Sequence, residues 1–171
     1  MQLDSSTVIA RAAAIPDTRA LRNAFGAFPT GVTVVTALSP EGTPLGVTVN
    51  SFASVSLAPP LVLWSQACSS PSHTAFFQAR TMVINILSED QSWLSTKFSR
   101  PGDDRFSGID FTSAACGTPV LAGCAATLVC SVADRYYGGD HTIFLCGVNE
   151  YENHHRAPLI FAGGSYLKRN D

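Results

Sequence analysis

Residues 31–50 read Gly-Val-Thr-Val-Val-Thr-Ala-Leu-Ser-Pro-Glu-Gly-Thr-Pro-Leu-Gly-Val-Thr-Val-Asn, and this stretch decides the fold class. Residues 31–38 are rich in β-branched side chains, which favour extended backbone. Residues 39–42 supply Ser, Pro and Gly, which favour turns, and residues 45–50 return to the strand pattern. The stretch therefore predicts two antiparallel strands joined as a hairpin.

The rest of the chain continues with short apolar strands separated by turns. Further strands are predicted at residues 60–65, 81–87, 124–136, 141–151 and 158–162, while residues 99–118 are expected to be mostly loop. The strands are joined mainly by turns and not by regular crossover helices. This pattern predicts a mainly β fold, an antiparallel barrel whose closure would leave no exposed sheet edge.

Three short helices are predicted around this barrel. Asp17 can cap a helix over residues 17–27, and Pro71 can occupy the first position of a helix over 71–79. Ser88 and Gln91 have the spacing of a capping box for a helix over 88–98. The first helix carries an apolar stripe formed by Leu21, Ala24, Phe25 and Phe28.

Length and charge limit the kinds of protein that this chain can be. Its 171 residues suggest one domain, which we place at residues 17–171 after an N-terminal arm at residues 1–16. Only 14% of the residues are charged, whereas soluble domains usually contain about 25%. Part of so uncharged a surface is expected to be covered by a partner subunit or a ligand. The net charge of −2 gives no field that would attract nucleic acid or an anionic membrane.

The N-terminus and the cysteines both favour a cytoplasmic location. Asp4 stands where a secretory signal needs basic residues, and Arg11 interrupts the apolar stretch that follows. No apolar run approaches the roughly 20 residues of a membrane span. The five cysteines are odd in number and form no Cys-x-x-Cys pair, so reduced thiols are expected.

The richest polar segment is residues 48–56, Thr-Val-Asn-Ser-Phe-Ala-Ser-Val-Ser. Four hydroxyl side chains and one amide gather at the end of a predicted strand, and Thr48, Asn50, Ser51 and Ser54 are the candidates for ligand binding. Short polar groups with nearby backbone N–H groups suit a flat polar heterocycle and a phosphate. The same residue types are common in ordinary turns, so a purely structural strand end is an equally open alternative.

Other candidate site residues lie in three separate segments. Thr30 and Gly31 follow the first helix, and the glycine would let a ligand approach the backbone closely. His141 follows Gly138-Gly139-Asp140 at a predicted hairpin tip, where turn geometry does not itself require a histidine. Lys97 and Arg105 are the cations that we would choose for a phosphate, although loop charges are often simply solvated. The adjacent pair at residues 154–155 lacks a third ligand, so no metal site is predicted.

Several known nucleotide and nucleophile motifs are absent from the sequence. It contains no Gly-x-Gly-x-x-Gly fingerprint, no phosphate loop of the Gly-x-x-x-x-Gly-Lys-Ser/Thr type and no Gly-x-Ser-x-Gly elbow. Any nicotinamide nucleotide would therefore need a site of another kind.

Taken in order, these segments resemble the short-chain flavin reductase family, whose fold is the FMN-binding split barrel. The resemblance covers about residues 18–168, and no single piece carries it alone. The matching pieces are LRNAFGAFPTGVTVVT (21–36), GVTVNSFASVSL (46–57), PPLVL (59–63), VINIL (83–87), RFSG (105–108), GDH (139–141) and PLIF (158–161).

The resemblance implies a homodimer with a flavin, FMN or FAD, near the subunit interface. It implies that residues 29–33 and 48–54 line the flavin, helped by residues 83–84 and by the stretch 93–98. It places residues 139–141 beside the nicotinamide of NADH or NADPH, with His141 as the candidate catalytic residue. The candidate cofactor-binding residues are Pro29, Thr30, Gly31, Val32, Thr33, Thr48, Val49, Asn50, Ser51, Ser54, Val83, Ile84, Lys97, Phe98, Arg105, Gly139, Asp140 and His141. Val49 departs from the family pattern, because relatives often carry a smaller residue there.

Hydride transfer to a flavin needs proximity and stacking more than a strong protein acid or base. The absence of a conspicuous carboxylate pair or nucleophilic triad is consistent with that chemistry. The resemblance also implies supply of reduced flavin to a separate monooxygenase. A split-barrel flavin oxidase, a flavin-storage protein and a non-enzymatic flavin or haem-related binding module remain open alternatives.

Overall fold

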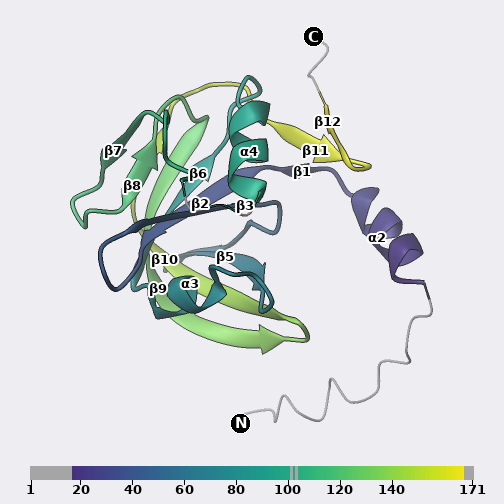
Figure 1. Ribbon diagram of the computed structural model, residues 1–171, viewed down its shortest axis with the longest axis horizontal. Helices are drawn as coiled ribbons and strands as arrows, with labels where there is room; N and C mark the ends of the chain where they lie inside the picture. Colours follow the sequence, from purple (N-terminus) through teal and green to yellow (C-terminus); the bar gives the residue numbers. More distant parts are fainter. Residues whose placement is uncertain (1–16, 101, 103, 168–171) are drawn as a thin grey trace.

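A seven-stranded antiparallel sheet forms the body of the molecule (Figure 1). The computed structural model describes residues 17–100, 102 and 104–167, so the predicted arm at residues 1–16 lies outside the described residues. The strand order is β3-β2-β6-β9-β10-β5-β4. Their bounds are β2 Thr33–Leu38, β3 Pro44–Val49, β4 Ala53–Leu57, β5 Pro60–Ala67, β6 Thr81–Ile86, β9 Ala126–Gly138 and β10 His141–Asn153.

The predicted hairpin and the mainly β, antiparallel fold are both confirmed. Strands β2 and β3 pair from Thr33 opposite Val49 to Leu38 opposite Pro44. The sheet curls, because β3 at one end also contacts β5 near the other end. The two end strands, β3 and β4, do not pair with each other. One edge of β3 therefore lies at the split of the barrel.

Two small sheets accompany the large one. Strands β1 (Thr30–Gly31), β11 (Ile160–Ala162) and β12 (Ser165–Leu167) form the first, and β7 (Phe111–Ser113) pairs with β8 (Pro119–Leu121) in the second. The strand predicted at residues 31–38 is thus divided, because the chain leaves β11 at Gly31 and joins the large sheet at Thr33. Strands β4, β7, β8 and β12 were not predicted: all are short, and β4, β7 and β12 are mostly exposed, so they show little apolar pattern.

Strand β2 is buried on both faces because two apolar clusters meet at it. Val35 and Ala37 pack into the core inside the curl, where Trp64 stacks on Phe144 with ring centroids 4.5 Å apart. The alternate residue Val34 faces a second cluster. That cluster also contains Val32, Leu87, Leu94, Phe98, Leu121, Cys124 and Leu159. Alternation along a strand sends successive side chains to opposite faces, so β2 connects the two clusters.

The first predicted helix is present as α2 (Thr18–Gly26), with Asp17 as its N-cap. The Asp17 carboxylate accepts hydrogen bonds from the backbone N–H groups of Arg19 and Ala20, both at 2.9 Å. Its apolar stripe, however, is not buried within the chain: Phe25 is 69% exposed and Phe28 is 76% exposed. Figure 1 shows α2 standing away from the sheet, to which β1 connects it.

The other two helices begin later than predicted. Helix α3 spans His73–Gln78 with Ser72 as its N-cap, so Pro71 lies before the helix and not at its first position. Helix α4 spans Ser92–Ser99, and the predicted capping box is wrong. The side chain of Gln91 does accept from the Ser88 N–H, at 3.1 Å, but the Ser88 hydroxyl donates to Gly123 O at 2.8 Å. That bond ties Ser88 to a distant loop.

All five cysteines are unpaired, and Cys124, Cys130 and Cys146 are buried. Burial raises the pKa of Cys130 to about 12 and that of Cys146 to about 11. Among the described residues, no helix has the length and apolar character needed to cross a membrane.

Candidate functional site

The polar strand end after β3 is held in place by bonds to two other elements. Thr48 Oγ1 donates to the Ser95 carbonyl of α4 at 2.7 Å. Ser51 Oγ donates to the carbonyl of Ser65 in β5 at 2.9 Å and accepts from its N–H at 3.0 Å. These two hydroxyls therefore stabilise the protein itself, as expected for a strand end with a structural role. Asn50 lies between them and is exposed, so its amide is open to a ligand.

This strand end separates two cavities. One, of about 310 Å³, is lined by residues 47–51, 65–67, Ser70 and His141. The other, of about 300 Å³, is lined by the same residues 48–50 together with Val32, Ser95, Ser99, Phe161 and Tyr166. Residues 48–50 contribute to both walls, so a flat ligand lying across Asn50 would reach both hollows.

His141 reaches the first cavity from the tip of the β9–β10 hairpin. Gly139 at the tip has φ +68°, which favours glycine. The His141 ring is oriented by Asp140, since its Nδ1 lies 2.7 Å from Asp140 Oδ1. The hydrogen bond to His141, and then the charge of that ring, lower the pKa of Asp140. Because Nδ1 is engaged, Nε2 is the ring nitrogen left for a ligand.

Residues 29–33 approach the second cavity through the strand switch between β1 and β2. Pro29 and Gly31 are exposed, and Val32 lines the cavity. Thr33 is buried, and its hydroxyl donates to the carbonyl of Val49 at 3.2 Å. The Thr30 hydroxyl is buried and has no hydrogen-bond partner among the described residues.

Three predicted residues offer no side-chain surface to a ligand. Val83, Ile84 and Phe98 are all fully buried. Val83 and Ile84 lie in β6, in the interior of the sheet, with strands on both sides. Their side chains fill the core, so any contact that they make with a cofactor would have to be indirect.

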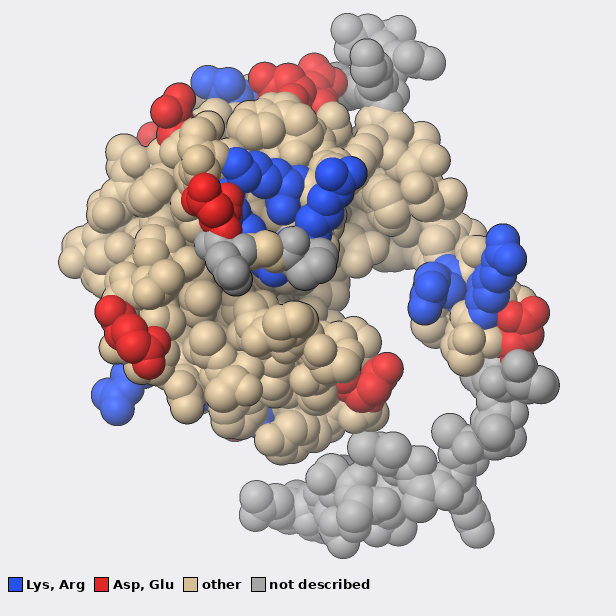
Figure 2. All heavy atoms as spheres, in the orientation of Figure 1, with Lys and Arg blue, Asp and Glu red and all other residues tan. Residues whose placement is uncertain are grey.

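The two predicted phosphate-binding cations are already engaged with backbone carbonyls. Lys97 Nζ donates to Ser107 O, and Arg105 donates to Gly46 O at 2.7 Å and to Gly102 O at 3.2 Å. Arg105 lines a third cavity, of about 460 Å³, between the start of β3 and the start of α3. Figure 2 shows Lys and Arg side chains gathered around a hollow in the region where Figure 1 draws α4.

Gly46 is a site residue that reasoning from residue types missed. A Cβ atom there would lie 2.3 Å from Phe98 Cε1, so only glycine allows α4 to pack this closely on β3. Ser95, Phe161 and Tyr166 were missed as well. They come from α4, β11 and β12, and only the fold brings them to β3.

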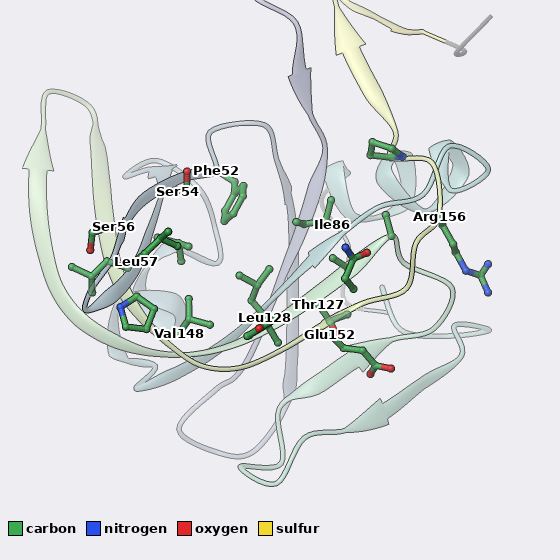
Figure 3. Close-up of a pocket in the computed structure, with 18 residues that line it drawn as sticks. Phe52, Ser54, Ser56, Leu57, Ile86, Thr127, Leu128, Val148, Glu152 and Arg156 are labelled. Atoms are coloured by element: carbon green, nitrogen blue, oxygen red, sulfur yellow. The ribbon is translucent and has the colours of Figure 1, made fainter. Parts of the chain in front are cut away.

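Ser54 is separated from the other predicted residues. It lines another cavity, an apolar groove of about 650 Å³ (Figure 3). Phe52, Leu57, Leu128 and Val148 contribute apolar side chains to this groove, while Glu152 and Arg156 lie toward one end of it. Leu57 is 93% exposed. The groove has the character of a contact surface and not of a polar ligand site.

Comparison with known proteins shows the family to which the chain belongs. Residues 25–168 match the family model described as the flavin reductase like domain. The chain is 49% identical over 150 residues to the FMN reductase (NADH) SmoA of Agrobacterium fabrum, covering 88% of this chain and 85% of that protein. It is 45% identical to the stachydrine N-demethylase reductase subunit Stc3 of Rhizobium meliloti, covering 88% of this chain and 66% of the relative. Two other relatives are about twice as long, with 49% and 50% of their length covered.

Solved structures give the same result. The NADH:FAD oxidoreductase SgcE6 of Streptomyces globisporus, in complex with NAD and FAD fragments, superposes with a TM-score of 0.86 at 36% identity, covering 93% of this chain and 97% of that one. The flavin reductase PheA2 in its native state gives 0.82 at 36% identity, covering 91% and 99% of the two chains. The chain therefore belongs to the flavin reductase like domain family.

Proposed function

We propose that this protein is an NADH-dependent flavin reductase that accepts FMN or FAD. One observation carries the proposal: His141 and the polar strand end at residues 47–51 line a single cavity. A nicotinamide beside His141 would therefore face a flavin held by the strand end. The names of the relatives support both flavins and NADH, since SmoA is named an FMN reductase (NADH) and SgcE6 an NADH:FAD oxidoreductase.

The residues around the strand end fit a flavin. A bound flavin would supply the hydride acceptor. Thr48 and Ser51 are fixed by α4 and β5, so the backbone between them is preorganised. Asn50 is exposed between these two anchors and offers both an amide donor and an acceptor to the polar edge of the ring. We assign Asn50 and the surrounding backbone to flavin binding, with Val49 beside the ring.

His141 has the position and the restraint needed for a nicotinamide-binding residue. Its Nδ1 is engaged with Asp140, and its side chain is 43% exposed. Hydride transfer requires the two rings to be held within a narrow range of distance and orientation. We assign His141 to holding the nicotinamide at the flavin, with Gly139 giving the dinucleotide close access to the backbone.

Lys97 and Arg105 are the proposed partners of the flavin phosphate. Arg105 donates hydrogen bonds to two carbonyls, but a guanidinium has five N–H donors, so others are available to bind an anion. Its bond to Gly46 O places it beside β3, on the strand that carries Thr48.

A homodimer is the assembly that we propose. Phe25 of α2 and Phe28 just after it are exposed, and so are Leu57 and Tyr151 of the apolar groove. Burying such side chains stabilises association, typically by about 1.5–3 kcal/mol for each fully buried large side chain. Since residues 29–33 begin three residues after the end of α2, a second copy that packs on α2 and Phe28 would also fix that side of the flavin site.

The cellular role that we propose is supply of reduced flavin to a separate monooxygenase. Several relatives are named as reductase components of such systems, including the reductase component of a flavin-dependent trigonelline monooxygenase from Acinetobacter baylyi. We also propose a cytoplasmic location, which the five unpaired cysteines support.

The test is anaerobic mixing of the purified protein with NADH and either FMN or FAD. We expect the absorbance of oxidised flavin to disappear, with many flavin molecules reduced by each protein molecule. Absence of reduction with both flavins would contradict the proposed activity. Two variants then divide the site: Asn50→Ala should weaken flavin binding, whereas His141→Ala should slow reduction while flavin affinity survives. A flavin titration of each variant separates the two effects.

A further inference from the structure

Thr142 lies next to His141 in β10 and faces the opposite way. Successive side chains of a strand point to opposite faces, so Thr142 points away from the cavity that His141 lines. Thr142 is only 1% exposed, and its Oγ1 lies 2.9 Å from Nε2 of His73, the first residue of α3. The two residues are 69 positions apart in the sequence, so this bond is a tertiary one.

The same face of the hairpin makes further contacts with α3. Tyr137 pairs with Thr142 across the hairpin, and its ring stacks on Phe77 of α3 with centroids 6.2 Å apart. Arg135, two residues before Tyr137, lies over the Phe77 ring at 5.4 Å and donates to the Ala79 carbonyl at 2.7 Å. Helix α3 therefore packs along the hairpin from Arg135 to Thr142.

The contacts with α3 add to the β-ladders that hold the hairpin tip, in which His141 pairs with Ala67 of β5 and with Gly138 of β9. Residues 136–140 are all exposed. Besides its β-ladder bonds, the tip receives a backbone bond from Cys68 N–H to Asp140 O at 2.8 Å. A shift of the tip would move His141 relative to the strand end after β3, where Thr48 and Ser51 are held by α4 and β5.

We propose that His73 and Thr142 are positioning residues for His141. The bond between them holds one face of β10 against α3, so the adjacent His141 on the other face keeps its place beside residues 47–51. This inference rests on the proposed role of His141 at the nicotinamide. Neither residue touches the reacting groups, and the two are joined by one partly buried hydrogen bond between Thr142 Oγ1 and His73 Nε2.

The experiment removes that bond from each side and then restores it. Thr142→Val and His73→Leu keep the size of the side chain and lose the bond. Thr142→Ser keeps the hydroxyl, and His73→Gln can present an amide N–H near the place of Nε2. A displacement of about 1 Å can cost roughly 100-fold in rate. We therefore expect the first two variants to reduce FMN with NADH at least about tenfold more slowly, while the last two retain most of the rate.

Measurements of flavin affinity and a matched control variant distinguish a displaced His141 from a general loss of structure. FMN titration should give the same affinity for all four variants. Thr81→Val removes another hydroxyl contact, the one 3.3 Å from Thr118, and should reduce FMN at the rate of the unaltered protein. If Thr81→Val is as slow as Thr142→Val, or if His73→Gln and Thr142→Ser rescue nothing, the inference is overturned.

A double-variant cycle tests the route through His141. In a His141→Ala background, His73→Leu should cause no further loss of rate. A full additional loss would mean that His73 acts elsewhere and would overturn the inference. If His141→Ala alone reduces FMN normally, the proposed role of His141 fails, and the positioning role fails with it. If His141→Ala is slow but His73→Leu and Thr142→Val are normal, only the present inference fails.

Discussion

Replacement of Gly46 by alanine should disturb both the stability and the cofactor site. The added Cβ would lie 2.3 Å from Cε1 and 2.5 Å from Cδ1 of Phe98, whereas ordinary contacts begin near 3.4 Å. The ring must therefore move by about 1 Å. Phe98 is fully buried and makes an edge contact with Phe106 at 5.1 Å, so it has no open space to enter. Overpacking of this kind costs typically about 1–3 kcal/mol.

The change should also reach the flavin. Phe98 belongs to α4, whose Ser95 carbonyl anchors Thr48, and Arg105 donates to the carbonyl of residue 46 itself. Urea denaturation should show the loss of stability, and FMN titration should show weaker binding. Gly147→Ala is the matched control, since the nearest atom to its added Cβ is 4.0 Å away. We expect that control to be neutral or slightly stabilising, because alanine restricts the unfolded chain.

A second substitution makes the argument refutable. Phe98→Leu removes ring atoms from the clash, so it should be less harmful in the Gly46→Ala background than alone. Equal effects in both backgrounds, or an unchanged urea midpoint for Gly46→Ala, would show that Phe98 has room to adjust and that glycine is not required.

Three other predictions follow from the same structure. Asn85→Ala should lower the free energy of unfolding by about 2 kcal/mol or more in urea titrations, because its amide serves the buried carbonyl of Val34 and the buried N–H of Leu121; a change within error would contradict this. The Cys130 thiol, with a pKa of about 12, should resist alkylation in the folded protein. The stability that it contributes is present below pH 9.0 and is lost as the pH rises toward 12; rapid labelling of this thiol, detected by mass spectrometry at pH 8, would count against its burial. Replacing both Phe25 and Phe28 by Ser should give a monomer by sedimentation, and a persistent dimer would place the interface elsewhere.

The large elements of the fold could be predicted because their causes are local. The β-branched runs and turn residues between positions 31 and 50 determine a hairpin that the structure confirms. The cap at Asp17 was also predictable, since the carboxylate bonds only the next turn. Ser88 and Gln91 show the limit of such reasoning. Their spacing is that of a capping box, yet the Ser88 hydroxyl lies within hydrogen-bond distance of the Asp90 carboxylate and of the carbonyl of Gly123, which is 35 residues away, and it does not cap α4.

The candidate site divides in the same way. Asn50 and His141 could be proposed from residue type, because polar side chains gather at this strand end and turn geometry does not itself require a histidine at a glycine tip. Their shared cavity could not be predicted, since it forms only when the curled sheet brings β3 to β5, the strand that pairs with β10. Conversely, Thr48 and Ser51 have the right chemistry for a ligand, but their hydroxyls are engaged by α4 and β5.

The hydroxyls that bind protein still contribute to ligand recognition, but indirectly. A ligand that uses Asn50 gains most if the chain on either side is already immobile, because the ordering cost is then met by folding and not by binding. Thr48 and Ser51 supply that immobility from two directions, one through α4 and the other through β5. The same logic applies to His141, whose neighbour Thr142 is bound to α3. In each case a residue close in sequence holds the candidate ligand-binding residue in place. The site therefore combines exposed ligand-binding side chains with neighbouring residues that are bonded to other elements of the fold.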